Sequence, residues 1–156
     1  ERPYRPCVGM MVFNSFGKIF SGQRLDNPGN AWQLPQGGID EGENPIQAAF
    51  RELKEETSII SVNFIAEYPS WINYDVPKNL ANNLWNGKYK GQTQKWLLFQ
   101  FIGSDDEINV DTKNPEFKNW LWLDPIELTA KAIYFKKQVY LKINKSFLPL
   151  IQNVIN

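Results

Sequence analysis

A glycine turn, a helix start and a cluster of glutamates follow one another in GGIDEGENPIQAAFRELKEETSI, residues 37–59. Asn44 suits the N-cap of a helix, Pro45 suits its first position, and Gln47 completes a capping box. The glycines before this start indicate a close backbone approach, because glycine has no side chain to obstruct one. The sequence therefore predicts a helix that begins after Asn44 and ends near Thr57.

One face of this predicted helix is apolar. Its members recur at the spacings of a helical stripe and are Ile46, Ala49, Phe50 and Leu53. Such a stripe is typical of a helix that buries one side against a sheet. We therefore expect all four side chains to be buried.

A second face of the helix is acidic. At about 100° per residue, Glu56 lies about 40° and Glu55 about 60° from Glu52, so the three carboxylates share one arc. Like charges at this spacing repel one another by roughly a few tenths of a kcal/mol per pair. A solvated acidic surface is the alternative reading, but the preceding glycine turn and Glu43 favour a functional cluster.

An arginine accompanies the glutamates. Arg51 can pair with Glu43 and Glu55 and still leave other carboxylate oxygens free for cations. Divalent metals need several oxygen ligands and tolerate bound water. Because such ions bridge phosphate oxygens and activate water, the pattern is consistent with cleavage of a phosphoanhydride.

The composition narrows the chemistry further. The chain has 156 residues, no histidine and one cysteine, Cys7, which excludes histidine triads, cysteine-rich zinc sites and intramolecular disulfides. Catalysis would then depend on carboxylates and on a hard cation such as Mg²⁺ or Mn²⁺. The length predicts one domain, residues 1–156. With no long apolar run and no signal-like start, we expect a cytoplasmic protein without a membrane partner.

Opposite charges are unevenly distributed. The 17 basic and 17 acidic residues sum to zero, which excludes a protein that coats DNA or an anionic membrane by bulk charge. Asp40–Glu56 is acidic, whereas Val76–Ser104 and Leu128–Asn156 contain lysines and no acidic residue. The net charge of zero therefore combines one acidic segment with two basic stretches, and the basic stretches could approach a polyanion.

Strands and helices alternate along the rest of the chain. In the first half we expect a hairpin of Cys7–Phe13 and Lys18–Arg24, a loop at Asp26–Ala31, one or two strands in Val62–Tyr74, and a short helix or ordered loop in Pro77–Trp85. In the second half we expect strands at Lys95–Ile102 and Phe117–Leu123. Two helices should follow Pro125, the second from about Phe135 to Gln152. Pro149 is expected to break that last helix. We expect Trp32, Trp71, Trp96, Trp120 and Trp122 to pack in the interior rather than contact a ligand. The mixture indicates an α/β or α+β sandwich.

The spacing of residues 37–59 resembles the Nudix box, a glycine, five residues, a glutamate, seven residues and then REUxEExGU with U apolar. Gly37, Glu43 and the run from Arg51 to Ile59 match it except at Ser58, where the family has glycine. That position is normally left-handed, so serine there costs on the order of 1 kcal/mol of strain or marks a different C-cap. No metal ligand is lost by this departure.

Further segments are similar to bacterial RNA pyrophosphohydrolases and asymmetric diadenosine tetraphosphate hydrolases. They are Tyr4–Gly9, Trp32–Gly38, Tyr74–Pro77, Gly91–Trp96 and Asn114–Phe117 with Trp120. The resemblance implies a Nudix α/β/α sandwich with a mixed sheet and a glutamate-rich helix. It implies Mg²⁺ ligands at Glu52, Glu55, Glu56 and Glu116, with the Gly37 carbonyl as a further ligand. Gly37, Gly38 and Glu43 would then be structural residues of the box, with Arg51 orienting the catalytic glutamates.

The resemblance also implies a set of substrate contacts. Residues expected to contact phosphates or the first bases are Arg5, Arg24, Tyr74, Gln92, Lys95, Phe135 and Lys136. Phe135 offers a stacking face for a base and is otherwise a core aromatic. Lys95 reaches a phosphate or simply extends from a strand end. Glu56 is assigned as the general base.

Three functions remain open on the sequence. The first is removal of pyrophosphate from 5′-triphosphorylated RNA, which leaves a 5′-monophosphate and initiates mRNA decay. The second is hydrolysis of diadenosine tetraphosphate or another dinucleoside polyphosphate. The third is a non-catalytic module that binds nucleotides or RNA 5′ ends. The sequence does not determine the oligomeric state, for which a monomer is favoured.

Overall fold

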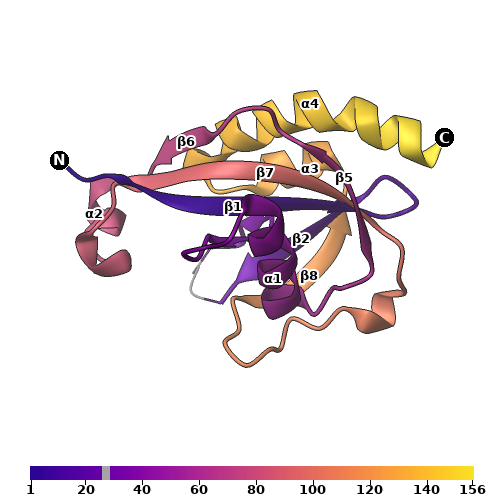
Figure 1. The fold of residues 1–156 in the computed structure, drawn as a ribbon, viewed down its shortest axis with the longest axis horizontal. Helices are drawn as coiled ribbons and strands as arrows, with labels where there is room; N and C mark the ends of the chain where they lie inside the picture. Colours follow the sequence, from indigo (N-terminus) through magenta and orange to yellow (C-terminus); the bar gives the residue numbers. More distant parts are fainter. Residues whose placement is uncertain (26–28) are drawn as a thin grey trace.

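The centre of the protein is a mixed sheet, seen edge-on in the computed structural model, which describes residues 1–25 and 29–156 (Figure 1). Its strands are β1 (Tyr4–Phe13), β2 (Ile19–Arg24), β3 (Trp32–Gln33), β4 (Gln36–Gly38), β5 (Val62–Glu67), β6 (Ile72–Asp75), β7 (Gly91–Phe101) and β8 (Phe117–Leu123). The strand order is β3-β2-β1-β7-β5, with β4 on β1, β6 on β7 and β8 on β2. Only the long β1–β7 pair is parallel among these described strands.

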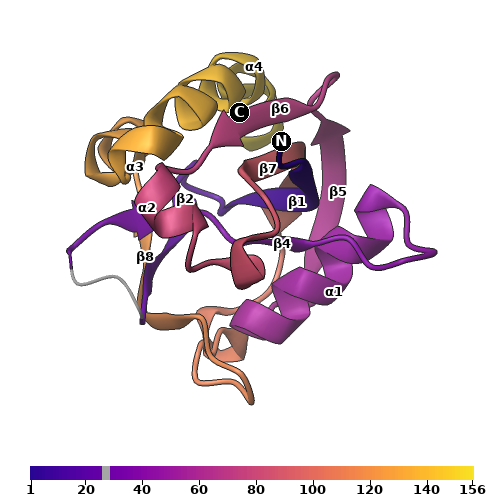
Figure 2. The same ribbon diagram turned by 90° about the vertical axis from the view of Figure 1, so that its left-hand side faces the viewer.

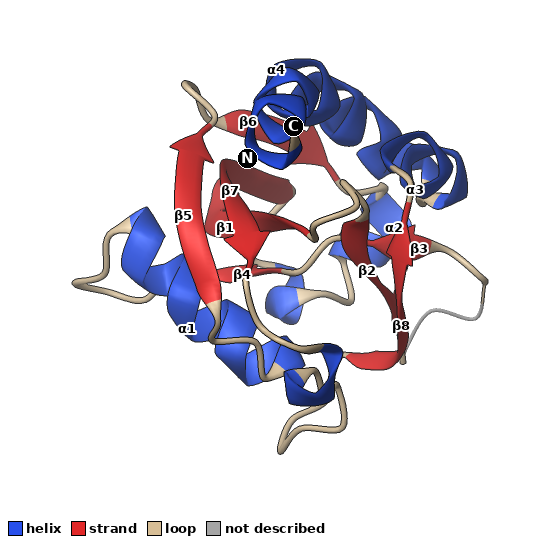
Figure 3. Cartoon of the chain, turned by 90° about the vertical axis from the view of Figure 1, so that its right-hand side faces the viewer, coloured by secondary structure: helices blue, strands red, loops and turns tan. Residues whose placement is uncertain are grey.

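Helices cover both faces of the sheet, which gives the expected α/β/α sandwich (Figures 1 and 3). The helix α1 (Pro45–Thr57) packs on one face, and α3 (Pro125–Lys131) with α4 (Lys137–Ile155) covers the other. The short helix α2 (Lys78–Ala81) and the 3₁₀ turns η1 (Trp85–Gly87), η2 (Asp105–Glu107) and η3 (Tyr134–Lys136) lie in the connections. In the part of the chain that is described, no helix is both long and apolar enough to cross a bilayer.

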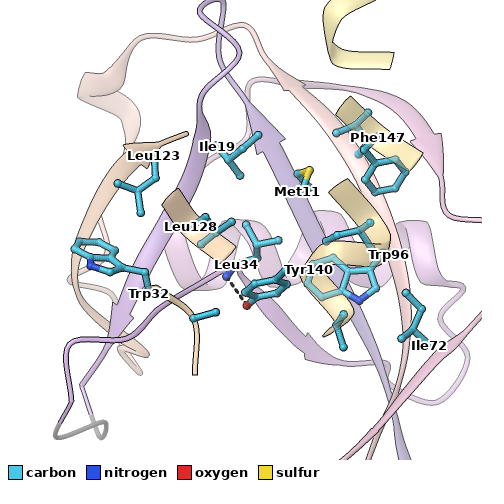
Figure 4. Close-up of a cluster of buried hydrophobic side chains, with 14 of the residues drawn as sticks. Met11, Ile19, Trp32, Leu34, Ile72, Trp96, Leu123, Leu128, Tyr140 and Phe147 are labelled. Carbon is cyan, nitrogen blue, oxygen red and sulfur yellow. Dashed lines mark hydrogen bonds between the residues drawn. The ribbon is translucent and has the colours of Figure 1, made fainter. Parts of the chain in front are cut away.

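Each face of the sheet has its own core. On the α4 side, Trp96 and Tyr140 are fully buried and meet edge to face, with ring centroids 6.0 Å apart (Figure 4). The Leu34 N–H donates to the Tyr140 hydroxyl at 3.0 Å, so this buried hydroxyl is satisfied. On the α1 side, Leu53 and Phe99 are fully buried. The two cores hold α1 and α4 at defined positions on opposite faces of the sheet.

Several predicted elements are confirmed. The hairpin of β1 and β2, the strand β8 and the helix α1 occupy their expected positions, and Val62–Tyr74 holds two strands, β5 and β6. The predicted interior strand begins earlier than expected, at Gly91, because β1 continues beside it from Tyr4 onward. The expected loop Asp26–Ala31 lies partly outside the described residues, which omit positions 26–28.

Two predictions about helices are wrong. Ile46 is only partly buried, and Phe50 is 40% exposed and meets Phe99 edge to face, because the face of α1 that meets the sheet is centred on Ala49 and Leu53. The last helix begins at Lys137 and runs to Ile155 with Pro149 inside it. Pro149 removes one backbone donor, but buried side chains on either side of it keep this helix against the sheet.

The expected burial of tryptophans holds for most of them. Trp32 and Trp96 are buried, and Trp120 stacks on Phe20 with ring centroids 5.6 Å apart. Trp71 is the exception, because 46% of its surface is exposed. It lies in the turn before β6 and borders a groove between that strand and α4.

Candidate active site

Local hydrogen bonds define both ends of α1 and so the register of its glutamates. The Gln47 N–H donates to Asn44 Oδ1 at 2.8 Å, and the Asn44 N–H donates to Gln47 Oε1 at 3.0 Å. Ser58 ends the helix with a φ of 68°, and its N–H donates to the Lys54 carbonyl. The predicted capping box is therefore confirmed, and of the two alternatives for Ser58 the structure shows the left-handed C-cap.

Arg51 is the centre of a hydrogen-bonded cluster. It donates twice to Glu43, at 2.7 and 2.8 Å, and to the Gly38 carbonyl at 2.9 Å. It also donates to Glu52 at 2.8 Å and to Glu55 at 3.2 Å. The paired guanidinium lowers the pKa of Glu43 to about 2. The expected pairing of Arg51 with Glu43 and Glu55 is confirmed, and it ties the turn to the helix.

The two glycines of the turn allow charged groups to approach the backbone. A Cβ on Gly37 would overlap the carboxyl group of Glu52, and a Cβ on Gly38 would lie 2.5 Å from Nη2 of Arg5. Larger residues would displace these side chains, so the absence of side chains here has a steric reason rather than a conformational one.

A cavity of about 600 Å³ opens beside α1 and the turn. Most of the residues expected at the site line it, and they are Arg5, Arg24, Gly37, Gly38, Glu52, Glu56, Tyr74, Gln92, Glu116, Phe135 and Lys136. They come from segments that are far apart in the sequence, namely β1, β2, β4, α1, β6, β7, η3 and the residue before β8. The fold therefore brings the acidic and basic candidates into one cavity.

Glu56 is the most deeply buried of the acidic residues here. Only 6% of its surface is exposed, and its Oε2 has no hydrogen-bond partner among the described residues. Burial, reinforced by the nearby charges of Glu52 and Glu116, raises the pKa of Glu56 well above its usual value. Burial also raises the pKa of Glu52, although its bond to Arg51 opposes the change. An unsatisfied buried carboxylate oxygen is costly, so it is typical of a ligand site.

Glu116 reaches the cavity from the opposite side. The Leu25 N–H donates to the Glu116 carbonyl at 3.0 Å, and the buried ring of Phe117 fits against Gly22, where a Cβ would lie 2.6 Å from it. This packing fixes the start of β8 beside β2. The carboxylate of Glu116 then lies 3.4 Å from Nη2 of Arg24.

The donor set suits a hard divalent cation. Glu52, Glu56 and Glu116 supply oxygen atoms to one cavity, and one of these atoms is the unpartnered Oε2 of Glu56. Within residues 1–25 and 29–156, however, no three acidic, histidine or cysteine side chains are gathered closely enough to hold an ion as they stand. Two of these carboxylates are paired with arginines, Glu52 with Arg51 and Glu116 with Arg24.

A polar wall faces the carboxylates. Gln94 Nε2 donates to Gln92 Oε1 at 2.8 Å and to Gln36 Oε1 at 2.9 Å, while its own Oε1 accepts from Trp96 Nε1 at 3.0 Å. These bonds fix the amide groups of Gln36 and Gln92 at the cavity surface. Lys136 is buried, and its ammonium donates to Gln33 Oε1 at 3.0 Å. Its charge is therefore held in place beside the cavity.

An aromatic and apolar wall completes the cavity. Phe135 stacks on Tyr74 with ring centroids 6.0 Å apart and an interplanar angle of 22°. Arg5 lies over the ring of Trp85, 5.8 Å from its centroid. Phe135 is only partly buried and borders the cavity, so its ring is available to a flat ligand group as well as to the core.

Four expected site residues do not line the cavity, and two of them, Arg51 and Glu43, belong to the hydrogen-bonded cluster beside it. The side chain of Glu55 is 58% exposed and contacts Arg51. Lys95 pairs with Glu67 at 3.1 Å. Alternation along β7 explains the position of Lys95. Residues an odd number of positions apart on a strand point to opposite faces, so Gln92 and Lys95 diverge.

Sequence reasoning missed several lining residues. Gln33 and Gln36 lie on either side of Leu34-Pro35 in the segment Trp32–Gly38, so they could have been proposed from that segment. Leu80, Leu84 and Trp85 come from the α2–η1 connection. No spacing or charge pattern there indicated a site, since their place depends on how this connection folds over the ends of the strands.

The fold and this carboxylate-lined cavity define a class of protein. The NUDIX domain model matches residues 3–143, and the chain belongs to that family. It is 50% identical over 149 residues to an RNA pyrophosphohydrolase of Cereibacter sphaeroides, covering 94% of this chain and 92% of the relative. It is 47% identical over 156 residues to the RNA pyrophosphohydrolase of Wolbachia pipientis, covering 99% and 96%.

A solved structure shows the same fold at low sequence identity. The dihydroneopterin triphosphate pyrophosphohydrolase of E. coli superposes with a TM-score of 0.71 at 21% identity, covering 90% of this chain and 97% of the other. Nudix hydrolases generally require divalent metal ions, which agrees with the oxygen-rich donor set described above.

Proposed function

We propose that this protein removes pyrophosphate from the 5′ end of triphosphorylated RNA and leaves a 5′-monophosphate. The observation that carries the proposal is the juxtaposition, in one cavity, of the buried Glu56 carboxylate with cationic and aromatic groups from the opposite walls. The names and the high identity of the relatives support the choice of substrate. The whole chain, residues 1–156, would act as one domain, since both helical layers pack on a single sheet.

Mg²⁺ is the proposed cofactor, with Mn²⁺ as a substitute. Its ligands would be Glu52, Glu55, Glu56 and Glu116, together with the Gly37 carbonyl. When bound, such an ion neutralises phosphate oxygens and makes water a stronger nucleophile at neutral pH. Glu56 is the proposed general base, because its buried position, beside other carboxylates, favours acceptance of a proton. Arg51 keeps Glu52 and Glu55 oriented on the helix.

The proposed substrate contacts divide by chemistry. Arg5, Arg24 and Lys136 supply positive charge for the terminal phosphates. Gln92 presents an amide held by its neighbours, and Phe135 with Tyr74 offers a stacked aromatic surface for a base. Lys95 has no place among these contacts because it points away from the cavity.

A direct assay tests the proposal. The purified protein is incubated with Mg²⁺ and a 5′-triphosphorylated oligonucleotide, and both pyrophosphate release and the monophosphorylated product are measured. We expect Glu56→Gln to lower kcat by about 100-fold or more, the range for loss of a general base. Glu41→Gln, at an exposed carboxylate of the turn, is the matched control and should keep full activity. Full activity of Glu56→Gln at saturating Mg²⁺ would remove Glu56 from this role.

The competing functions are distinguished in the same assay. Diadenosine tetraphosphate is supplied in parallel, and kcat/KM is compared for the two substrates. A strong preference for the dinucleotide would replace the RNA assignment. Binding of triphosphorylated RNA without turnover in either Mg²⁺ or Mn²⁺ would instead indicate a non-catalytic module.

A further inference from the structure

A second groove lies between β6 and α4, on the edge of the molecule. Its volume is about 590 Å³, and it is lined by the turn before β6, by β6 itself and by the middle of α4. Figures 1 and 2 both show β6 running beside α4. None of the groups assigned to the cavity chemistry lines this groove.

The groove is basic. Lys142 and Lys145 lie three residues apart on α4, so both project on the same side of the helix, and both are exposed. Among the described ion pairs neither lysine has a carboxylate partner. No acidic residue occurs between Leu128 and Asn156, and Glu67 at the end of β5 is paired with Lys95. The charge of the two lysines is therefore free to attract an anion.

An aromatic side chain lies beside the two lysines. Trp71 lines the groove and is 46% exposed, although its sequence context predicted a packed residue. An exposed ring next to unpaired lysines is the combination by which proteins bind single-stranded nucleic acid, since the ring stacks on a base while the ammonium groups contact phosphates. The groove thus complements a short flexible polyanion that carries flat groups.

The groove adjoins the cavity through two elements. The strand β6 carries Tyr74 in the cavity and Trp71 precedes the same strand, about 10 Å away along an extended chain. On the other side, Lys136 borders the cavity, and α4 continues from it to Lys142 and Lys145, about 9 and 13 Å further along the helix axis. A strand whose first nucleotide occupied the cavity would reach the groove within a few nucleotides.

We propose that the groove formed by Trp71, Lys142 and Lys145 binds the single-stranded RNA that follows the 5′ end. The inference rests on the proposed function, because it extends the substrate from the terminal phosphates to the next few nucleotides. Lys142 and Lys145 contact backbone phosphates, and Trp71 stacks on a base. This contact is independent of sequence and adds affinity without altering the reacting groups.

The test compares RNA lengths. Lys142→Ala/Lys145→Ala and Trp71→Ala are assayed on a triphosphorylated dinucleotide, which is too short to reach the groove, and on an unstructured triphosphorylated octanucleotide. We expect each variant to raise KM for the octanucleotide by about fivefold or more with kcat unchanged. For the dinucleotide both constants should match the wild type. The double variant should also reduce the slope of log affinity against log salt by about 1.4, because each lost phosphate contact removes about 0.7.

Two control proteins accompany these variants. Lys142→Arg/Lys145→Arg keeps the charges and should behave as the wild type. Lys113→Ala/Lys118→Ala removes the same formal charge from exposed positions, the loop before β8 and β8 itself, and should leave both substrates unaffected. An equal loss on both RNA lengths would show a structural effect and overturn the proposal, as would an unchanged KM for the octanucleotide in the variants.

The same variants separate the groove from the chemistry. Turnover of the dinucleotide establishes the proposed function whatever happens in the groove. If no triphosphorylated RNA is hydrolysed, the proposed function fails, and fluorescence anisotropy with a monophosphorylated octanucleotide still measures the groove. Wild-type binding that exceeds that of Lys142→Ala/Lys145→Ala by about fivefold supports it. Equal binding refutes it, and so does lysine-dependent binding to anionic vesicles alone.

Discussion

Replacement of Ser58 measures how much stability the protein loses by having serine, where the family has glycine, at the end of α1. Its φ of 68° is left-handed, a conformation that costs a residue with a Cβ about 1–2 kcal/mol. Glycine in turn loses about 0.4–1 kcal/mol through its larger unfolded-state entropy, so glycine should be about 1 kcal/mol more stable than alanine here. Serine differs from alanine because its hydroxyl donates to the Asn109 carbonyl at 2.8 Å, which contributes about 1 kcal/mol.

These contributions predict that serine and glycine are nearly equivalent. Ser58→Gly should unfold in urea at the same free energy as the wild type, within about 0.5 kcal/mol, whereas Ser58→Ala should lose about 1 kcal/mol and melt about 2–4 °C lower. Neither change removes a proposed metal ligand, so kcat/KM should be unchanged in both. Equal stability of all three proteins would refute the argument, because it would show that neither the backbone strain nor the hydroxyl contact matters.

Three further changes probe the site and the core. The pKa of Glu56 is higher in the folded protein than in the unfolded chain, so the folded state binds the proton more tightly. With a chelator present, the free energy of unfolding of the wild type should therefore fall as the pH rises through the raised pKa. Glu56→Gln should lose that dependence in urea titrations at several pH values. Gly37→Ala should lower kcat/KM by about tenfold or more, because the new Cβ displaces the Glu52 carboxyl group, and steady-state kinetics will show it. Tyr140→Phe should cost about 1–3 kcal/mol in urea unfolding, because it leaves the buried Leu34 N–H without its acceptor; an unchanged midpoint would contradict this.

The helix α1 could be predicted closely because its signals are local. The cap at Asn44, the reciprocal bond of Gln47 and the left-handed residue after Thr57 depend only on neighbouring residues. The pairing of Arg51 with Glu43 was equally accessible, since a helix and the turn that precedes it leave few other partners for either charge. Local chemistry thus sufficed for the acidic half of the candidate site.

The basic and aromatic half depends on tertiary contacts that no local pattern encodes. Trp85 reaches the cavity because the α2–η1 connection folds across the strand ends, and Lys136 is held by Gln33 from a strand about a hundred residues earlier. The same limit accounts for the wrong expectations at Phe50 and Trp71, since each has an apolar neighbourhood in sequence but a solvent-exposed place in the fold. Periodicity indicates which residues share a face, and only the packed partner decides whether that face is covered.

The zero net charge acquires a spatial meaning from this arrangement. The acidic segment Asp40–Glu56 lies mostly on α1, whereas the acid-free stretch Leu128–Asn156 forms α3, η3 and α4 on the other face of the sheet. Residues of both segments meet at the cavity, which Glu52, Glu56 and Lys136 line together. A long polyanion would be repelled by the acidic segment and attracted by the acid-free stretch, and beyond about 10 Å salt screens both effects. A phosphorylated RNA end that enters the cavity is close to the acidic and the basic residues at once. This arrangement favours binding of an RNA end over binding along a long nucleic acid.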